Sequence, residues 1–78
     1  MTHPGQSDSQ LDRAVLKLMQ RETCASATFL TRRCERPLEQ IRGAVARLMV
    51  RGLAKQAYAG THPMDDCWCI TDAGRAER

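Results

Sequence analysis

Pro37 is the residue that most constrains the fold of this chain, because it separates two segments that would otherwise form one longer helix. Proline cannot continue a helix at an interior position, and it disfavours helical geometry at the residue before it, here Arg36. Proline does suit the first position of a helix, where its missing N–H costs nothing. The sequence therefore predicts one helix that ends before Arg36 and another that begins at about Pro37.

The second of these segments, from about Pro37 to Arg51, has the spacing of an amphipathic helix. Its apolar residues recur at three- and four-residue steps, which place side chains on one face. They are Leu38, Ile41, Val45, Leu48 and Met49. Gly52 follows where a left-handed residue would close the last turn. The opposite face is expected to be exposed, at about 100° per residue. It holds Gln40, Gly43 and Arg47, flanked by Glu39, Ala44, Val50 and Arg51.

The segment before Arg36 predicts a shorter helix that begins after Ser26, because a serine hydroxyl suits the N-cap position. Leu30 and Cys34 lie one turn apart on its inner face, so Cys34 is expected in the core. Two short helices joined by a tight turn form a helix-turn-helix. Glutamine and arginine can read base edges, so we predict that the second helix enters a DNA groove.

Positive charge is concentrated on this helix pair. From Arg32 to Lys55 there are seven basic and two acidic residues, a net charge of +5, whereas the whole chain carries only +3. The rest of the chain is therefore acidic on balance. Such a distribution is expected of a surface that faces phosphate groups. The alternative is a solvated arginine face on an ordinary pair of helices.

The chain before the helix pair predicts one further helix and a polar end. Residues 1–8 have no apolar anchor and are expected to form a disordered tail. Ser9 is expected to cap a helix that ends near Arg21. Its inner stripe is Leu11, Ala14, Val15, Leu18 and Met19. Residues 23–25 are too few for a helix, but they suit a short extended segment that pairs with a later strand.

After Gly52 the apolar period changes from that of a helix to that of strands. Residues 53–58 and 67–71 are expected to be strands, and the loop 59–66 between them makes a hairpin. Alternation places Trp68 and Ile70 on the core face, and Cys67 and Cys69 on the other face. Residues 72–78 are expected to be a last helical turn capped by Asp72, or a frayed end.

This order of elements resembles that of winged helix-turn-helix DNA-binding domains, from about Ser9 to Arg75. The passage IRGAVARLMVRGLA, Ile41 to Ala54, is similar to the family's third helix running into the first wing strand. The passage CITDAGR, Cys69 to Arg75, is similar to the end of the second wing strand. The resemblance implies an α+β fold: a three-helix winged helix-turn-helix with a two- to three-stranded antiparallel wing sheet.

The resemblance also implies where the contacts with DNA lie. Gln40, Arg42, Gly43 and Arg47 would lie on the groove side of the third helix, and Thr61, His62 and Met64 at the wing tip. One feature departs from the family. Its wing commonly offers Arg or Lys to the minor groove, whereas this loop has Asp65 and Asp66. Either these aspartates point away from the duplex, or the wing contacts something else, such as a basic partner.

Length and composition favour one small domain, residues 9–78, rather than a multidomain enzyme. Only three of the 78 residues are aromatic, so the core must be mainly aliphatic. There is no run of about 18 apolar residues and no secretory signal, so we expect a cytoplasmic protein without a membrane span. The four cysteines are then expected to be reduced thiols.

Neither a metal site nor an active site is favoured. Cys67 and Cys69, with Cys24 or His62, leave a metal or redox role open. Alternate strand positions stand about 6 to 7 Å apart, however, which suits a structural zinc site poorly, so small apolar filler is the preferred interpretation. No acid–base pair and no glycine-rich phosphate loop is present, so we predict no enzyme activity and no cofactor.

The predicted function is sequence-specific binding of double-stranded DNA by a small transcriptional regulator. The alternative is an adaptor that uses the same surface on a protein. A homodimer or a protein partner is left open, because specific regulators generally bind paired half-sites. The predicted DNA-binding residues are Arg32, Arg33, Arg36, Gln40, Arg42, Gly43, Arg47, Arg51, Thr61 and His62.

Overall fold

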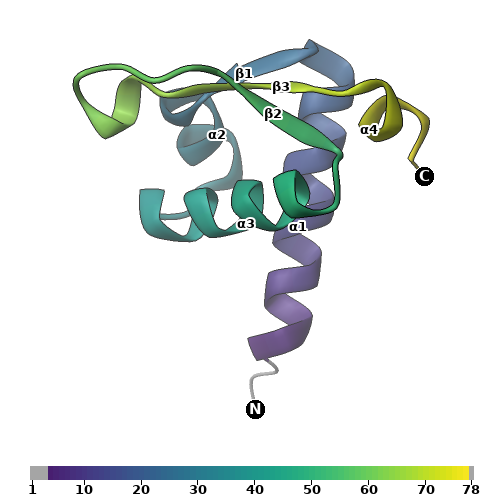
Figure 1. The fold of residues 1–78 in the computed structure, drawn as a ribbon. Helices are drawn as coiled ribbons and strands as arrows, with labels where there is room; N and C mark the ends of the chain where they lie inside the picture. The colour runs from purple at the N-terminus through teal and green to yellow at the C-terminus, as the bar shows by residue number, and fades with distance from the viewer. Residues whose placement is uncertain (1–3, 78) are drawn as a thin grey trace.

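The computed structural model describes residues 4–77 as four helices, a three-residue 3-10 helix and three strands (Figure 1). The order is α1 (Pro4–Glu22), β1 (Cys24–Ser26), α2 (Ala27–Cys34), α3 (Leu38–Val50), β2 (Ala54–Tyr58), η1 (Pro63–Asp65), β3 (Cys67–Ile70) and α4 (Asp72–Ala76). The predicted α+β class and the predicted order of elements are confirmed.

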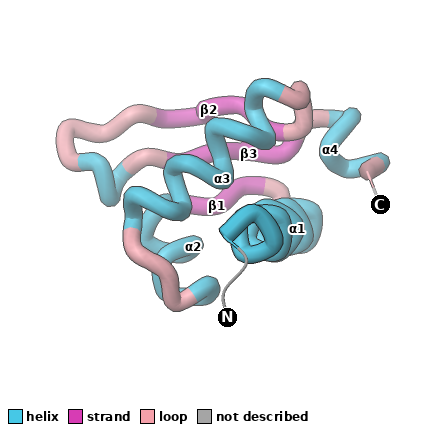
Figure 2. The backbone as a smooth tube through the Cα atoms, turned by 90° about the horizontal axis from the view of Figure 1, so that it is seen from below, coloured by secondary structure: helices cyan, strands magenta, loops and turns pink. Residues whose placement is uncertain are grey.

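The three strands form one antiparallel sheet in the order β1-β3-β2. The short segment predicted to pair with a later strand does so, since Ala25 of β1 lies opposite Trp68 of β3. Helices α2 and α3 lie under one face of this sheet, and α1 crosses α3, running from the level of the sheet to below α3 (Figures 1 and 2). Helix α3 packs against both α1 and the sheet.

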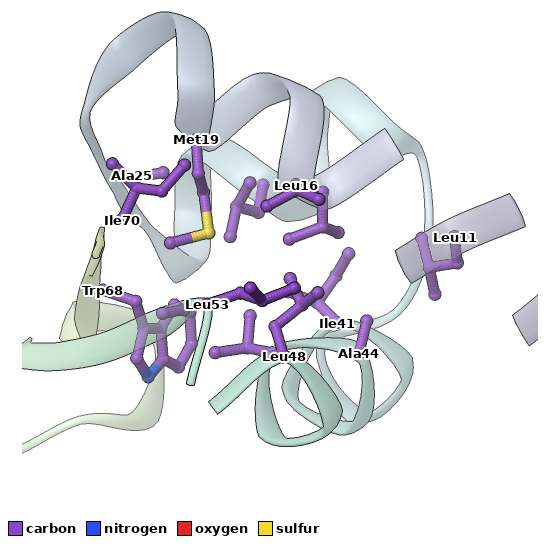
Figure 3. Close-up of a cluster of buried hydrophobic side chains, with 14 of the residues drawn as sticks. Leu11, Leu16, Met19, Ala25, Ile41, Ala44, Leu48, Leu53, Trp68 and Ile70 are labelled. Carbon is purple, nitrogen blue, oxygen red and sulfur yellow. The ribbon is translucent and has the colours of Figure 1, made fainter. Parts of the chain in front are cut away.

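The core fills the space between the helices and the sheet (Figure 3). Trp68 and Ile70 point into it, as predicted from the alternation along β3. In α1, Leu11, Val15 and Met19 are buried as predicted, but Ala14 is exposed, Leu18 is only partly buried and Leu16 is buried instead. The contacts of α1 with α3 turn the Leu16 side of the helix inward, and spacing along one helix does not reveal that rotation.

The ends of α2 and α3 follow from local signals. The Ser26 hydroxyl accepts the Phe29 N–H at 3.1 Å, which confirms the predicted cap of α2. Pro37 is the N-cap of α3 rather than its first residue. Gly52 has φ +77°, and the Leu53 N–H donates to the Leu48 carbonyl at 2.9 Å, which closes the last turn as predicted.

The two outer helices differ from expectation in their boundaries. Helix α1 begins at Pro4, not at Ser9, so residues 4–8 of the expected tail are helical, and residues 1–3 lie outside the described part. Proline needs no N–H partner in a first helical turn, so this early start is permitted. Helix α4 is capped by the Thr71 hydroxyl, which accepts the Gly74 N–H at 3.1 Å, and not by Asp72.

The cysteines also differ from expectation. Cys24 and Cys69 form a disulfide between β1 and β3, so they are not reduced thiols. They are opposite each other in the antiparallel register, which brings their side chains together on the face of the sheet that points away from the helices. Cys24 is exposed, so it is not apolar filler. Cys34 and Cys67 have free thiols, and each is half-buried.

Candidate nucleic-acid interface

Helix α3 presents one face to solvent between α1 and the hairpin loop. Glu39, Gln40 and Ala46 are exposed on it, and Val50 is 88% exposed. Gly43 is half-buried. Ala44 was expected to flank this face, but it is fully buried, because the core stripe of α3 is wider than its large residues alone suggest.

Each arginine of α3 and its C-cap has a carboxylate partner from a different part of the chain. Arg42 Nη1 lies 3.6 Å from Asp66 Oδ2, next to β3, and Arg51 Nη2 lies 3.2 Å from Glu77 Oε2 near the C-terminal end. Arg47 pairs with Asp12 of α1. These carboxylates lie far from α3 in the sequence, so the helical pattern gave no sign of them.

The Arg47–Asp12 pair has the most specific geometry of the three. Arg47 donates from Nε to both carboxylate oxygens, at 3.1 and 2.9 Å, and from Nη2 to Oδ1 at 2.8 Å. Its Nη1 lies over Gly43, where an added Cβ would stand 3.4 Å from it. The side chain of Arg47 therefore lies along α3 toward its N-terminal half, held by α1.

The arginines of α2 and the turn are disposed differently. Arg32 and Arg33 are exposed, Arg36 is half-buried, and none of the three has an ion pair within the described residues. Arg36 Nη1 donates to the Gln40 side chain at 3.0 Å, and the Arg33 guanidinium lies 5.7 Å from the centre of the Phe29 ring. Within this helix pair, the positive charge without a carboxylate partner among the described residues therefore lies on α2 and the turn, not on α3.

Arg33 and Arg36 also line a hollow of about 520 Å³ between α1 and the end of α2, together with Lys17 and Arg21 of α1. We call this the basic hollow. Leu11, Leu18 and Cys34 provide its apolar lining. Burial raises the pKa of the Cys34 thiol, although Arg36 and Arg33 act to lower it. The sequence-based prediction did not include the basic hollow, because it assigned only core residues to α1.

The hairpin loop carries Thr61 and His62, both exposed, as expected of a tip. Met64 is half-buried, and its carbonyl accepts the Thr28 hydroxyl at 3.1 Å, which ties the loop to α2. Asp66 is buried, and its carboxylate accepts the Gly60 N–H at 3.3 Å. Both aspartates of this loop were expected to repel phosphate. Asp66 is turned inward, however, and of the two only Asp65 is exposed.

Among the residues that the structure describes, no three His, Cys, Asp or Glu side chains come close enough together to hold a metal ion. No helix in the described part of the chain is long and apolar enough to cross a membrane.

Comparison with known proteins identifies the fold. No family model and no curated protein matches the sequence. Among solved structures, a MarR family regulator from Neisseria meningitidis matches 85% of this chain with a TM-score of 0.74 and 18% identity. The transcriptional regulator BldR from Sulfolobus solfataricus matches 85% with a TM-score of 0.72 and 27% identity. The chain is a winged helix-turn-helix domain.

A mutant of ZitR from Lactococcus lactis in its apo form matches 91% of the winged helix-turn-helix chain, with a TM-score of 0.72 and 15% identity. The chain spans about half the length of these structures: 46%, 47% and 53% respectively. In this winged helix-turn-helix, α2 and α3 are the helix-turn-helix pair, and β2, η1 and β3 form the wing. The predicted fold is confirmed, and no subfamily is identified.

Proposed function

We propose that this domain binds double-stranded DNA as part of a transcriptional regulator, with α3 in the major groove. The observation that carries the proposal is the position of the basic charge. Arginines stand on α2, on the turn and along both edges of α3, around an α3 face that solvent reaches. The likeness to a MarR family regulator and to a transcriptional regulator at 27% identity supports the regulatory role.

Within this proposal the predicted residues have distinct roles. Arg32, Arg33, Arg36 and Arg51 contact phosphates, Gln40 and Arg47 point at base edges, Arg42 and Gly43 lie on the groove side, and Thr61 and His62 contact the duplex from the wing tip. Phosphate contacts position the protein and supply most non-specific affinity, whereas base contacts supply specificity.

The ion pair of Arg51 at the end of α3 is compatible with this proposal. The side chains of Arg51 and Glu77 are 53% and 37% exposed, and exposed ion pairs contribute about 0–1 kcal/mol to stability. Exchanging such a carboxylate for a phosphate of DNA therefore costs little. A single domain of this size offers few base contacts, so strong specificity requires a second copy or a further module on another half-site.

Chemical-shift mapping of the domain with a random-sequence duplex at low salt tests the proposal. We expect shifted amides within residues 32–51 and at Thr61 and His62, and we expect the shifts to disappear as salt is raised, because phosphate contacts release counterions. An unchanged spectrum at the lowest salt concentration would contradict DNA binding.

The basic hollow favours one alternative, an adaptor that binds an acidic protein. Its four cationic side chains surround an apolar lining, which is the chemistry that an acidic amphipathic segment requires. In that case the amides of Lys17 and Arg21 on α1 should shift with an acidic amphipathic peptide, while duplex DNA leaves the spectrum unchanged.

A further inference from the structure

We propose that Arg36 is a positioning residue for DNA recognition, which holds the side-chain amide of Gln40 so that Gln40 reads a guanine in the major groove. This inference rests on the proposed function of the domain and deepens it. It links a phosphate contact in the turn to a base contact on α3, so that the two residues act as one unit.

The turn between the helices places Arg36 and Gln40 side by side. Gln40 lies in the first turn of α3, and the N-terminal residues of a recognition helix are those that contact base edges. Arg36 Nη1 donates to Gln40 Oε1 at 3.0 Å. The Arg36 backbone N–H donates to the Thr31 carbonyl at 3.3 Å, and Pro37 restricts the backbone that follows. The local fold therefore positions both residues of the pair before DNA is bound.

The chemistry of arginine decides which end of the Gln40 amide is held. A guanidinium has only hydrogen-bond donors, so the group that faces Arg36 must be the amide oxygen and not the amide nitrogen. The N–H2 group is then the free end of the side chain. Gln40 is exposed, and its side chain makes no other hydrogen bond within the described residues. Gln40 therefore presents hydrogen-bond donors to the groove.

A free glutamine pairs with adenine, because its oxygen accepts from N6 of the base while its N–H2 donates to N7. The oxygen of Gln40 already accepts from a cation, which makes a second donor at that oxygen less favourable. Guanine offers two acceptors, O6 and N7, at its major-groove edge, whereas cytosine offers the N4 donor. Gln40 held by Arg36 should therefore prefer guanine to adenine, and cytosine should be disfavoured.

Arg36 also has further N–H donors, which are directed by the same planar group and suit a phosphate. A phosphate that fixes Arg36 thereby fixes Gln40, so the loss of either side chain should reduce the contribution of the other. Arg32 is the matched comparison. It is exposed on α2 and has no hydrogen bond with Gln40 within the described residues, so its phosphate contact and the base contact of Gln40 should be independent.

The first experiment is a selection from a pool of duplexes with a randomised centre. The base position at which Gln40→Ala loses its preference is the position that Gln40 reads. We expect the wild type to select guanine there. Arg36→Ala should select adenine, because a released glutamine forms the bidentate pair with that base. Arg32→Ala should bind every duplex more weakly and still select guanine.

The second experiment is a double-mutant cycle, measured by titration of the duplex that the wild type selects. Arg36→Ala combined with Gln40→Ala should lose less affinity than the product of the two single losses, by about twofold or more, which is the low end of coupling between residues in contact. The losses of Arg32→Ala and Gln40→Ala should multiply. Fluorescence of Trp68, which is buried in the core, verifies that each variant is folded.

The possible outcomes separate this inference from the function on which it rests. If Arg36→Ala still selects guanine and its loss multiplies with that of Gln40→Ala, Arg36 does not position Gln40, although DNA binding stands. If the wild type selects a base other than guanine at this position, or if Gln40→Ala loses no preference, the inference is wrong and DNA binding remains. If no variant binds any duplex, the proposed function itself is wrong and the inference falls with it.

Discussion

Breaking the Cys24–Cys69 disulfide should remove a large part of the stability of this domain. The bond joins residues 45 positions apart, and the chain-entropy model gives about 4 kcal/mol for closing a loop of that length in the unfolded state. A domain of 78 residues is expected to have a free energy of unfolding of about 4 to 12 kcal/mol. Reduction should therefore bring the domain close to unfolding, or unfold it.

Urea unfolding followed by tryptophan fluorescence measures this effect, because Trp68 is buried beside the disulfide on β3. The midpoint should fall on adding a phosphine reductant and should fall equally in Cys24→Ser/Cys69→Ser without reductant. Cys67→Ser is the matched control on the same face of β3; because its half-buried thiol forms no disulfide, this substitution should lower the midpoint much less than loss of the bond does. Equal midpoints for the oxidised wild type, the reduced wild type and the double variant would refute the reasoning.

Two further predictions concern α3 and the DNA surface. Leu48→Ala should lower the free energy of unfolding by about 2 to 5 kcal/mol, because Leu48 is fully buried, whereas Val50→Ala on the exposed side of the same helix should leave it nearly unchanged; equal urea midpoints for the two variants would contradict the packing of α3. Arg32→Ala should weaken binding to every duplex and reduce the salt dependence by about one unit, whereas Gln40→Ala should lose about 1 to 3 kcal/mol at the preferred site alone. Titrations of both variants with selected and random duplexes measure these effects. If Arg32→Ala and Gln40→Ala lose affinity in the same way on both duplexes, the two roles are wrong.

The parts of the fold that the sequence predicts are those determined by neighbouring residues. The Ser26 cap, the break at Pro37 and the left-handed Gly52 each depend on a few adjacent residues, and all three are present in the structure. The alternation along β3 likewise places Trp68 inward without knowledge of its partners. Short-range physical chemistry is sufficient for the element order, and therefore for the fold class.

The parts that the sequence does not predict depend on contacts between distant segments. The rotation of α1, which buries Leu16 in place of Ala14, is set by where α3 lies. The disulfide depends on the register between β1 and β3. The expectation of a cytoplasmic protein had instead predicted that Cys24 and Cys69 are reduced thiols. The carboxylates that pair with the arginines of α3 come from distant parts of the chain, so the helical pattern of α3 could not indicate them.

The ion pairs alter how the positive charge of α2 and α3 is distributed over the surface. The sequence predicts one basic surface from Arg32 to Lys55. Lys55, however, lies on β2 opposite Cys69 of β3, on the face of the sheet that points away from the helices. Carboxylates pair with the arginines of α3, so under the proposed function the contribution of this helix pair to long-range attraction comes chiefly from α2 and the turn. Attraction and recognition are then assigned to different helices, and substitutions in one should leave the other largely intact.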